Sequence, residues 1–308
     1  MSLGVRLADG AGSARATFWL GGSEEMSECD RFERACRGDG WDYSRRLRCL
    51  DFEWSILSND ALFAGCVTDL YEPCIVGGAG PATHVFIVRR HRNVESAPVS
   101  LYRDGEAVLR RVPEDLAFAQ LAWEVNRGVV EEAGNRLLLH AAAAERDGRI
   151  VILAGPEGSG KSTLVSALVR SGLRYVTDET VAVELAAGTI GPYPKPISLR
   201  ETEHCQRLVP ANEIRRDVVA MSGGHARLLV LLAGYEPGRA TAARAITRAE
   251  AAVALAEQSF NFRTLGPGRL DAVAEVVRAC DCYRLEVGDL DAGCRLVLDL
   301  FETASPSR

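Results

Sequence analysis

Eight consecutive residues near the middle of the chain have the types and spacing of a phosphate-binding loop. The segment GPEGSGKS, from Gly155 to Ser162, matches G-x-x-x-x-G-K-[ST] at every defined position. Its glycines let the backbone turn tightly and point N–H groups inward, so that a di- or triphosphate can sit at the start of a helix. Lys161 would place a positive charge near the β- and γ-phosphates, and the hydroxyl of Ser162 could bind Mg²⁺.

The sequence around the loop supports this interpretation. Arg149 to Ala154 (RIVILA) has the apolar, β-branched run of a buried strand, and Thr163 to Ser171 has helical spacing that ends at Gly172. The alternative, a glycine-rich turn that binds nothing, fits poorly with a complete motif in this context. ATP and Mg²⁺ are therefore the expected cofactors. The residues expected to bind the nucleotide are Gly155, Pro156, Glu157, Gly158, Ser159, Gly160, Lys161, Ser162 and Thr163.

Phosphate-binding loops of this kind need a second contact to Mg²⁺, usually an acid at the end of a neighbouring strand. The apolar run Leu228 to Ala233 has no carboxylate at its tip, whereas Asp178 and Glu179 follow the expected strand Leu173 to Thr177. One carboxylate of this pair can hold Mg²⁺, and the other can accept a proton from an attacking hydroxyl. We expect Ser162 and Asp178 to be the metal ligands. The alternative for the pair is a solvated acidic turn.

His140 is a further candidate for the same site. It ends the apolar segment LLLH and precedes four alanines and the turn Arg146-Asp-Gly148, which leads into the strand of the loop. A strand that ends in this histidine could return to the same sheet edge. An isolated histidine more often has a structural role, and the residues alone leave both roles open.

These motifs together resemble the catalytic domain of HPr kinase/phosphorylase, and more closely the HPr-kinase-related proteins outside sugar-transport regulation. The resemblance covers about residues 115 to 302. The matching segments are Leu139-His140-Ala141, the loop Gly155 to Ser162, the helix ending at Gly172, Asp178-Glu179 and Lys195-Pro-Ile-Ser-Leu199.

The resemblance implies an α/β fold: a P-loop kinase domain of HPr kinase / phosphoenolpyruvate carboxykinase type, with a strongly bent mixed sheet and a smaller N-terminal α+β module. It implies that His140 positions the phosphate and supports the base, and that Asp178 and Glu179 form the metal and base pair. The family's usual pair is Asp-Asp, so Glu179 reaches about one methylene further. Lys195, Arg200 and Arg263 are expected as phosphate or substrate anchors.

The function expected from the resemblance is transfer of the γ-phosphoryl group of Mg-ATP to an alcohol, foremost a serine hydroxyl of a peptide or small protein. A kinase of a small alcohol such as free serine is one alternative. A nucleotide-binding switch or scaffold with slow hydrolysis is the other. The family's glycine- and arginine-rich region for HPr binding and phosphorolysis is not found here, so the sequence does not indicate the reverse reaction.

The sequence also predicts how the chain is divided. Residues 1–16 are expected to be a flexible N-terminus, 17–114 a small α+β module and 115–304 the nucleotide-binding domain. Helices are expected over 59–71, 114–130, 247–258 and 289–302, and an irregular segment over 188–200. Strands are expected over 18–20, 51–57, 84–90, 99–103, 173–177, 181–185, 228–233 and 283–287.

Composition restricts the partners and the compartment. A net charge of −6 argues against a nucleic-acid partner, and no apolar run approaches the roughly 18 residues of a membrane span. No signal peptide is recognisable at the N-terminus. The nine cysteines lack zinc-site spacing, so buried, reduced thiols and a cytoplasmic location are expected. The oligomeric state is left open between a monomer and a homo-oligomer.

Overall fold

The structure is a computed structural model that describes residues 4–6, 42–43, 45–77, 82–93, 95–185, 187–202, 205–214, 223–266 and 268–304. The fold is mixed α/β, and the chain forms two compact units. Unit 1 comprises 1–48, 52–126 and 200–208, and unit 2 comprises 49–51, 127–199 and 209–308. The domain boundaries given above stay predictions. Of the expected flexible N-terminus only Gly4–Arg6 is described, as strand β1, and the strand expected over 18–20 lies outside the described residues.

Unit 1 is built on a mixed sheet with the order β2-β4-β5-β6-β7, and β3 pairs with β4. Strands β4 and β5 are parallel, and β6 forms antiparallel hairpin pairs with β5 and β7. The expected strands over 51–57, 84–90 and 99–103 are confirmed as β4, β5 and β6. The bounds are β2 Asp42–Tyr43, β3 Leu47–Cys49, β4 Phe52–Ser58, β5 His84–Arg90, β6 Val99–Arg103 and β7 Glu106–Val112.

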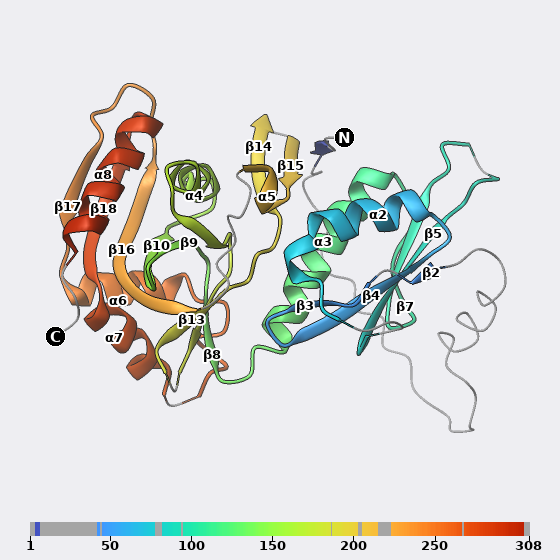
Figure 1. Ribbon diagram of the computed structural model, residues 1–308, viewed down its shortest axis with the longest axis horizontal. Helices are drawn as coiled ribbons and strands as arrows, with labels where there is room; N and C mark the ends of the chain where they lie inside the picture. Colours follow the sequence, from blue (N-terminus) through green and yellow to red (C-terminus); the bar gives the residue numbers. More distant parts are fainter. Residues whose placement is uncertain are drawn as a thin grey trace. The chain divides into compact units, whose positions relative to one another are not determined.

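Aromatic side chains join the helices of unit 1 to its sheet. Helix α2 (Ala61–Leu70) and helix α3 (Glu114–Glu131) meet through Phe63 and Phe118, whose rings stack at 4.0 Å between centroids. Trp54 of β4 makes edge contacts with Tyr71, just after α2, and with Phe86 of β5. Both helices were expected from the sequence, and both lie near the sheet of this unit in Figure 1. A short 3₁₀ turn, η1 (Glu72–Cys74), follows α2.

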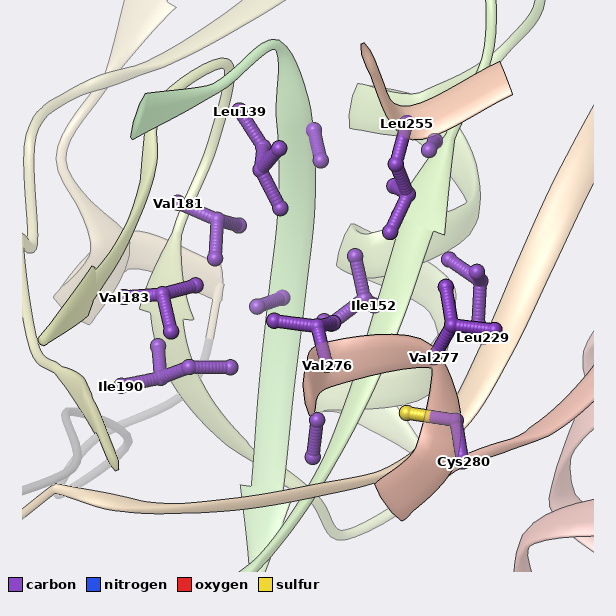
Figure 2. Close-up of a cluster of buried hydrophobic side chains, with 14 of the residues drawn as sticks. Leu139, Ile152, Val181, Val183, Ile190, Leu229, Leu255, Val276, Val277 and Cys280 are labelled. Carbon is purple, nitrogen blue, oxygen red and sulfur yellow. The ribbon is translucent and has the colours of Figure 1, made fainter. Parts of the chain in front are cut away.

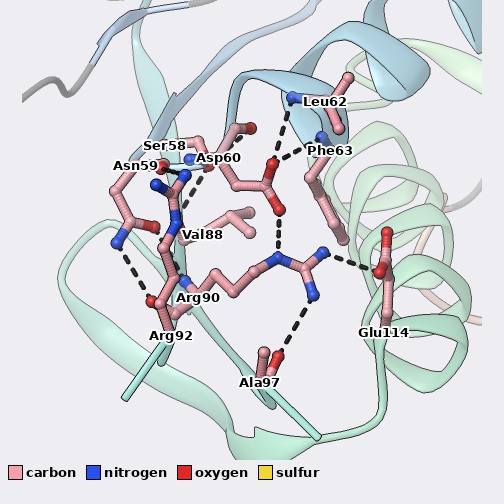
Figure 3. A network of polar contacts seen from close by, with 10 residues as sticks. All are labelled: Ser58, Asn59, Asp60, Leu62, Phe63, Val88, Arg90, Arg92, Ala97 and Glu114. Atoms are coloured by element: carbon pink, nitrogen blue, oxygen red, sulfur yellow. Dashed lines mark hydrogen bonds and ion pairs between the residues drawn. The ribbon is translucent and has the colours of Figure 1, made fainter. Parts of the chain in front are cut away.

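A buried polar network fixes the junction between β4 and α2 (Figure 3). Asp60 accepts hydrogen bonds from the first amides of α2, those of Leu62 and Phe63, and also pairs with the guanidinium of Arg90 on β5. Arg90 reaches Glu114 at the start of α3 at 2.7 Å. The network therefore ties two strands and two helices of unit 1 together.

Unit 2 is organised around a nine-stranded mixed sheet with the order β11-β9-β10-β16-β13-β12-β8. The long strand β16 runs parallel to β10 on one side, and its other side pairs first with β13 and then with β18, which also carries β17. The bounds are β8 Arg136–Leu139, β9 Ala141–Arg146, β10 Arg149–Ala154, β11 Arg174–Thr177, β12 Val181–Glu184, β13 Thr189–Gly191, β16 Gly224–Tyr235, β17 Ala242–Ala245 and β18 Asp281–Val287. A separate three-stranded sheet, most of whose residues belong to unit 1, joins β1, β15 (Cys205–Val209) and β14 (Ile197–Thr202).

Helices cover both faces of this sheet (Figure 1). Helices α4 (Lys161–Arg170) and α8 (Leu290–Thr303) pack on the face that carries Val151 and Leu153 of β10. Helices α6 (Arg248–Glu257) and α7 (Arg269–Ala279) pack on the opposite face, in the cluster drawn in Figure 2. Because β10 is buried on both faces, its sequence is a continuous apolar run instead of an alternating one. Helix α5 (Ala211–Ile214) is a single turn.

Most elements expected in unit 2 are confirmed, including the capping box of Thr247 and Glu250 and the cap of α8 by Asp289. Several elements were not expected, among them β9, α7, β17 and the single turn α5. The alanine run 141–144 belongs to β9, an interior strand, although alanine has a low strand propensity. Helix α7 was also missed. The segment 188–200, expected to be irregular, is mostly strand (β13 and β14), and only residue 188 and residues 192–196 lack regular structure.

The six cysteines whose side chains the structure describes are free thiols. Cys66 is partly exposed, and the other five are buried: Cys49, Cys74, Cys280, Cys282 and Cys294. Among the described residues no cluster of His, Cys, Asp and Glu could hold a metal by itself. None of the described helices is both long enough and apolar enough to cross a membrane.

Candidate functional site

The site lies where two antiparallel chain segments of unit 2 bend together. The segment β8–β9 (136–146) runs beside the segment β11–β12 (174–184), with Leu139 opposite Val181 and Ala143 opposite Thr177. Between these pairs the amide of Ala141 donates to the carbonyl of Glu179 at 3.2 Å. His140 lies between β8 and β9, and Asp178 and Glu179 lie between β11 and β12, so the histidine and the acidic pair are next to each other on the two segments.

The glycine-rich loop joins the same edge of the sheet. Ala154, the last residue of β10, pairs with Ala141 of β9, so that Gly155 begins the loop next to His140. Strands β10 and β11 are both antiparallel to β9, which lies between them. Their carboxyl ends consequently meet at one edge, and this register explains why residues 155–162 and 178–179 come together.

The loop has the geometry of an anion cradle. Gly160 adopts φ 92°, a left-handed conformation that favours glycine, directly before α4. At Gly155 a Cβ atom would lie only 2.7 Å from the carbonyl oxygen of Leu232. The ammonium of Lys161 donates to the carbonyls of Gly155 and Pro156 at 2.8 and 3.0 Å. Burial lowers the pKa of Lys161, although the carboxylates of Asp178 and Glu179 oppose this effect.

A phosphate group suits the chemistry of this loop. The hydroxyl oxygen of Ser159 is buried and has no hydrogen-bond partner within the described part of the chain. An unsatisfied buried polar atom calls for an explanation, and a ligand is one. The start of α4 at Lys161 offers free amides and the positive end of the helix dipole, with no side chain capping it. The loop residues therefore fit a nucleotide phosphate.

Ser162 and Asp178 form a pair of oxygen donors that fits Mg²⁺. The Ser162 hydroxyl donates to Asp178 Oδ1 at 3.0 Å, and the backbone N–H of Ser198 donates to Oδ2 at 3.3 Å. Asp178 is buried, and burial raises the pKa of its carboxyl, although Lys195 opposes the shift. Mg²⁺ is commonly bound by one or two carboxylates together with waters and substrate phosphates, so a larger cluster of acids is not required.

Glu179 is held differently from its neighbour. Its backbone has φ 72°, unusual for a residue other than glycine, and its half-exposed carboxylate forms an ion pair with the ammonium of Lys195. This ammonium is the main reason why the pKa of Glu179 lies below its ordinary value. The backbone of Lys195 is fixed from behind, because its carbonyl accepts a hydrogen bond from the Tyr175 hydroxyl at 2.9 Å. The two carboxylates are thus adjacent in sequence but have separate partners.

His140 is positioned by a segment that follows α6. Its N–H donates to the carbonyl of Gln258 at 2.6 Å, and its ring lies 5.5 Å from that of Phe260, a partly exposed aromatic residue. Burial is the first cause, and the charge of Lys161 the second, of a lowered pKa for His140. Asn261 supports the segment by accepting from the Leu138 amide at 3.0 Å and donating to the Arg136 carbonyl at 2.7 Å.

The structure thus gathers His140, the loop 155–162, Asp178, Glu179 and Lys195. Two expected anchors are not placed with them. Arg263 is exposed in the loop after α6, and no hydrogen bond or ion pair among the described residues links it to the cluster. Arg200 lies in β14, but its side chain is outside the described part of the structure. Sequence reasoning missed the supporting roles of Tyr175, Ser198 and Asn261, which depend on contacts that no local pattern encodes.

Fold and site together define a mixed α/β protein in which a glycine-rich strand-to-helix loop, two carboxylates and two lysines share one sheet edge. No protein-family model matches the chain, and no curated protein matches it. Among solved structures it is similar to the HPr(Ser) kinase/phosphatase from Coxiella burnetii, with 12% identity over 54% of this chain and 93% of that chain, and a TM-score of 0.30. This similarity is too low to carry an argument, so function has to be argued from the site.

Proposed function

We propose that this protein is a Mg-ATP-dependent kinase that transfers the γ-phosphoryl group to an alcohol, foremost a serine hydroxyl of a peptide or small protein. The observation that carries the proposal is the contact between Ser162 and Asp178 at the start of α4, with a second carboxylate, Glu179, at the next position. A protein that only binds a nucleotide needs the pair of Ser162 and Asp178. A phosphotransferase also uses the second carboxylate, that of Glu179, as a base.

The residues divide into three roles. The loop amides and Lys161 bind the phosphates, and Ser162 and Asp178 hold the metal. When bound, Mg²⁺ would neutralise charge that develops on the β- and γ-phosphate oxygens. Lys161 and His140 lie at the edge where the γ-phosphate would be. The charge of Lys161 would stabilise the transferring group, and His140, whose lowered pKa keeps it neutral, would position the phosphate and support the base.

Glu179 is the candidate base. The acceptor hydroxyl loses its proton to the Glu179 carboxylate while its oxygen forms the new bond to the γ-phosphorus. The bond between that phosphorus and the bridging oxygen breaks, and ADP leaves. The transition state of phosphoryl transfer is loose, so positioning of the acceptor hydroxyl contributes more to the rate than the basicity of the group that takes its proton. A carboxylate with a lowered pKa can therefore serve as the base.

The ion pair of Glu179 with Lys195 also favours a second candidate function. A carboxylate engaged by an ammonium is not free to accept a proton, as would suit a nucleotide-binding switch or scaffold with slow hydrolysis. A kinase of a small alcohol such as free serine remains the alternative within the first function. These candidates differ in whether an acceptor accelerates ATP consumption.

The test is ATP consumption and phosphoryl transfer by the purified protein with Mg²⁺, alone and with serine-containing peptides, free serine or HPr. Asp147→Asn is a matched control for Asp178→Asn, since Asp147 is exposed in the turn at the opposite end of β10. Under the kinase proposal one acceptor stimulates turnover strongly, and Asp178→Asn and Glu179→Gln abolish the stimulation while Asp147→Asn keeps it. Slow hydrolysis indifferent to every acceptor favours the switch. Failure to bind ATP rules out both functions.

A further inference from the structure

The chain contains only two lysines, Lys161 and Lys195, against 34 arginines. Both lysines lie at the candidate site, and both are 6% exposed. Arginine therefore supplies the positive charge everywhere else, and lysine occurs only where a buried ammonium faces the two carboxylates. An ammonium is a compact charge with rotatable donors on a flexible stem, whereas a guanidinium holds a carboxylate in a fixed bidentate fork. A lysine therefore suits a position at which the cation exchanges one partner for another.

The backbone of Lys195 is fixed by its surroundings, whereas the contact of its side chain can be exchanged. Pro194 and Pro196 flank it, its N–H donates to the Tyr193 carbonyl at 2.8 Å, and its own carbonyl accepts from Tyr175. The stem then extends to Glu179, which is itself in a left-handed backbone conformation. The ion pair is the contact of this side chain that can be exchanged without moving the backbone.

The other charges of the site define what could compete for Lys195. Lys161 contacts carbonyls of the loop, so the loop's own cation is already committed to the phosphate cradle. Asp178 is engaged by Ser162 and Ser198. A triphosphate in the cradle would bring its terminal charge to the edge where Glu179 and His140 lie. Glu179 and that terminal phosphate would then compete for the same ammonium.

We propose that Lys195 exchanges partners: it pairs with Glu179 in the nucleotide-free and ADP-bound protein, and with the γ-phosphate in the ATP-bound protein. The exchange frees the carboxylate of Glu179 only when a phosphoryl group is present to be transferred. It also makes Lys195 the residue by which the site distinguishes ATP from ADP. This inference rests on the proposed nucleotide site and adds a control over its base.

Competition has a thermodynamic signature that simple phosphate binding lacks. If Glu179 holds Lys195 back, removing the charge of Glu179 makes ATP bind more tightly, because breaking the ion pair no longer opposes binding. The gain must disappear when Lys195 is also replaced. Neither removing the charge of Glu179 nor replacing Lys195 should affect ADP binding, since ADP lacks the γ-phosphate that would contact Lys195.

The first experiment uses calorimetry, with Mg²⁺ present, to measure the affinity of the protein for a non-hydrolysable ATP analogue and for ADP. We expect Glu179→Gln to tighten analogue binding about 5-fold and Lys195→Met to weaken it about 10-fold or more, within the usual range of coupling energies. ADP affinity should stay within about twofold of wild type for both variants. In the double variant the effect of Glu179→Gln should vanish, and Asp147→Asn should behave as wild type. Equal weakening of ATP analogue and ADP by Lys195→Met, or unchanged analogue affinity in Glu179→Gln, overturns the exchange.

The second experiment uses the wild-type chain, so it does not depend on a variant that folds. Labelling with ¹³Cε-lysine gives two side-chain NMR signals, because the chain has two lysines, and a Lys195→Arg sample assigns them. The Lys161 signal should move with both nucleotides, and the Lys195 signal only with the ATP analogue. A Lys195 signal that moves equally with ADP, or with neither nucleotide, contradicts the proposal. If the exchange is observed but no acceptor stimulates turnover, the kinase function fails alone. If neither nucleotide binds, both proposals fail.

Discussion

Asp178 is the residue at which stability and the proposed chemistry conflict. Its carboxyl is buried, and burial raises its pKa, so the ionised form needed to hold a cation is disfavoured by the nucleotide-free fold. The hydrogen bonds from Ser162 and Ser198 and the charge of Lys195 offset only part of this cost. Carboxyl groups with a strongly perturbed pKa cluster at functional sites.

We therefore predict that Asp178→Asn stabilises the nucleotide-free protein at neutral pH while it abolishes metal-dependent turnover. A carboxyl whose pKa is higher in the folded state stabilises the fold at low pH, and this contribution is lost as pH rises through the folded pKa. The variant cannot ionise, so its advantage over wild type should grow as pH rises from 4, near the ordinary pKa of an aspartate, to 8, by about 1.4 kcal/mol for each unit by which folding raises the pKa. Urea unfolding without Mg²⁺ at the two pH values measures it.

The pH dependence of this difference is the diagnostic quantity, because the asparagine also loses one acceptor for the Ser198 amide. That loss costs the same free energy at both pH values, so it does not alter the trend. Asp147→Asn, at an exposed turn, should show no comparable trend. If Asp178→Asn and wild type differ by the same amount at pH 4 and pH 8, burial does not control the ionisation of Asp178.

At the scale of elements, the short strand β8 depends on Asn261 to present His140. The Asn261 side chain is buried and satisfies backbone groups of Leu138 and Arg136 that lie on the edge of the sheet. We predict that Asn261→Ala lowers the free energy of unfolding by about 1–3 kcal/mol, because two buried backbone groups lose their partners. Chemical denaturation measures the loss. Thr264→Ala, which removes one exposed hydroxyl contact to the Asn261 carbonyl, is the control and should cost much less.

In unit 1 the polar network around Arg90 holds strands and helices together in a similar way. Arg90→Met leaves the buried Asp60 carboxylate without its guanidinium partner, and we predict a loss of about 3 kcal/mol or more. Burial by itself raises the pKa of Asp60, but Arg90 and the amides of Phe63 and Leu62 together outweigh it and the net pKa is lowered. This stabilisation is therefore present above the unfolded pKa and lost as pH falls, and Arg90→Met should flatten that acid dependence.

The double variant Asp60→Asn/Arg90→Met is the test of this interpretation. Asparagine keeps an oxygen to cap α2, and it carries no charge to be stranded. The double variant should recover a large part of the stability lost in Arg90→Met. If the two variants are equally unstable, the loss comes from packing of the arginine stem and not from an unpaired charge.

The elements that local patterns predicted are the ones whose patterns are complete within a few residues. The run RIVILA predicts strand β10, and the loop glycines predict the start of helix α4. The caps Thr247 and Asp289 predict the starts of helices α6 and α8. Strand β9 was missed because alanine has a low strand propensity, and the burial of its alanines between β10 and β11 exists only in the folded sheet. The presence of His140, Asp178 and Glu179 at one site is set by register between segments some 40 residues apart, which composition and periodicity do not encode.

At the scale of the whole molecule, the candidate site belongs to one compact unit only. The loop, the acidic pair, Lys195 and His140 all lie in unit 2, which contains no tryptophan, whereas the two described tryptophans, Trp54 and Trp123, lie in unit 1. Tryptophan fluorescence therefore follows unfolding of unit 1 alone, while far-UV circular dichroism follows both units. The distribution of residues provides two separate probes within one chain.

We predict that Mg²⁺ with a non-hydrolysable ATP analogue raises the unfolding temperature seen by circular dichroism and leaves the tryptophan transition unchanged. A ligand stabilises the cooperative unit that binds it by RT ln(1 + [L]/Kd), about 2.7 kcal/mol at 100 times Kd. The shift should vanish in Lys161→Met and shrink when Mg²⁺ is chelated. Amide hydrogen exchange should slow about 100-fold in β10 and not in β5. If the fluorescence transition moves together with the dichroism signal, the two units unfold as one, and binding at the loop stabilises residues that make no part of the site.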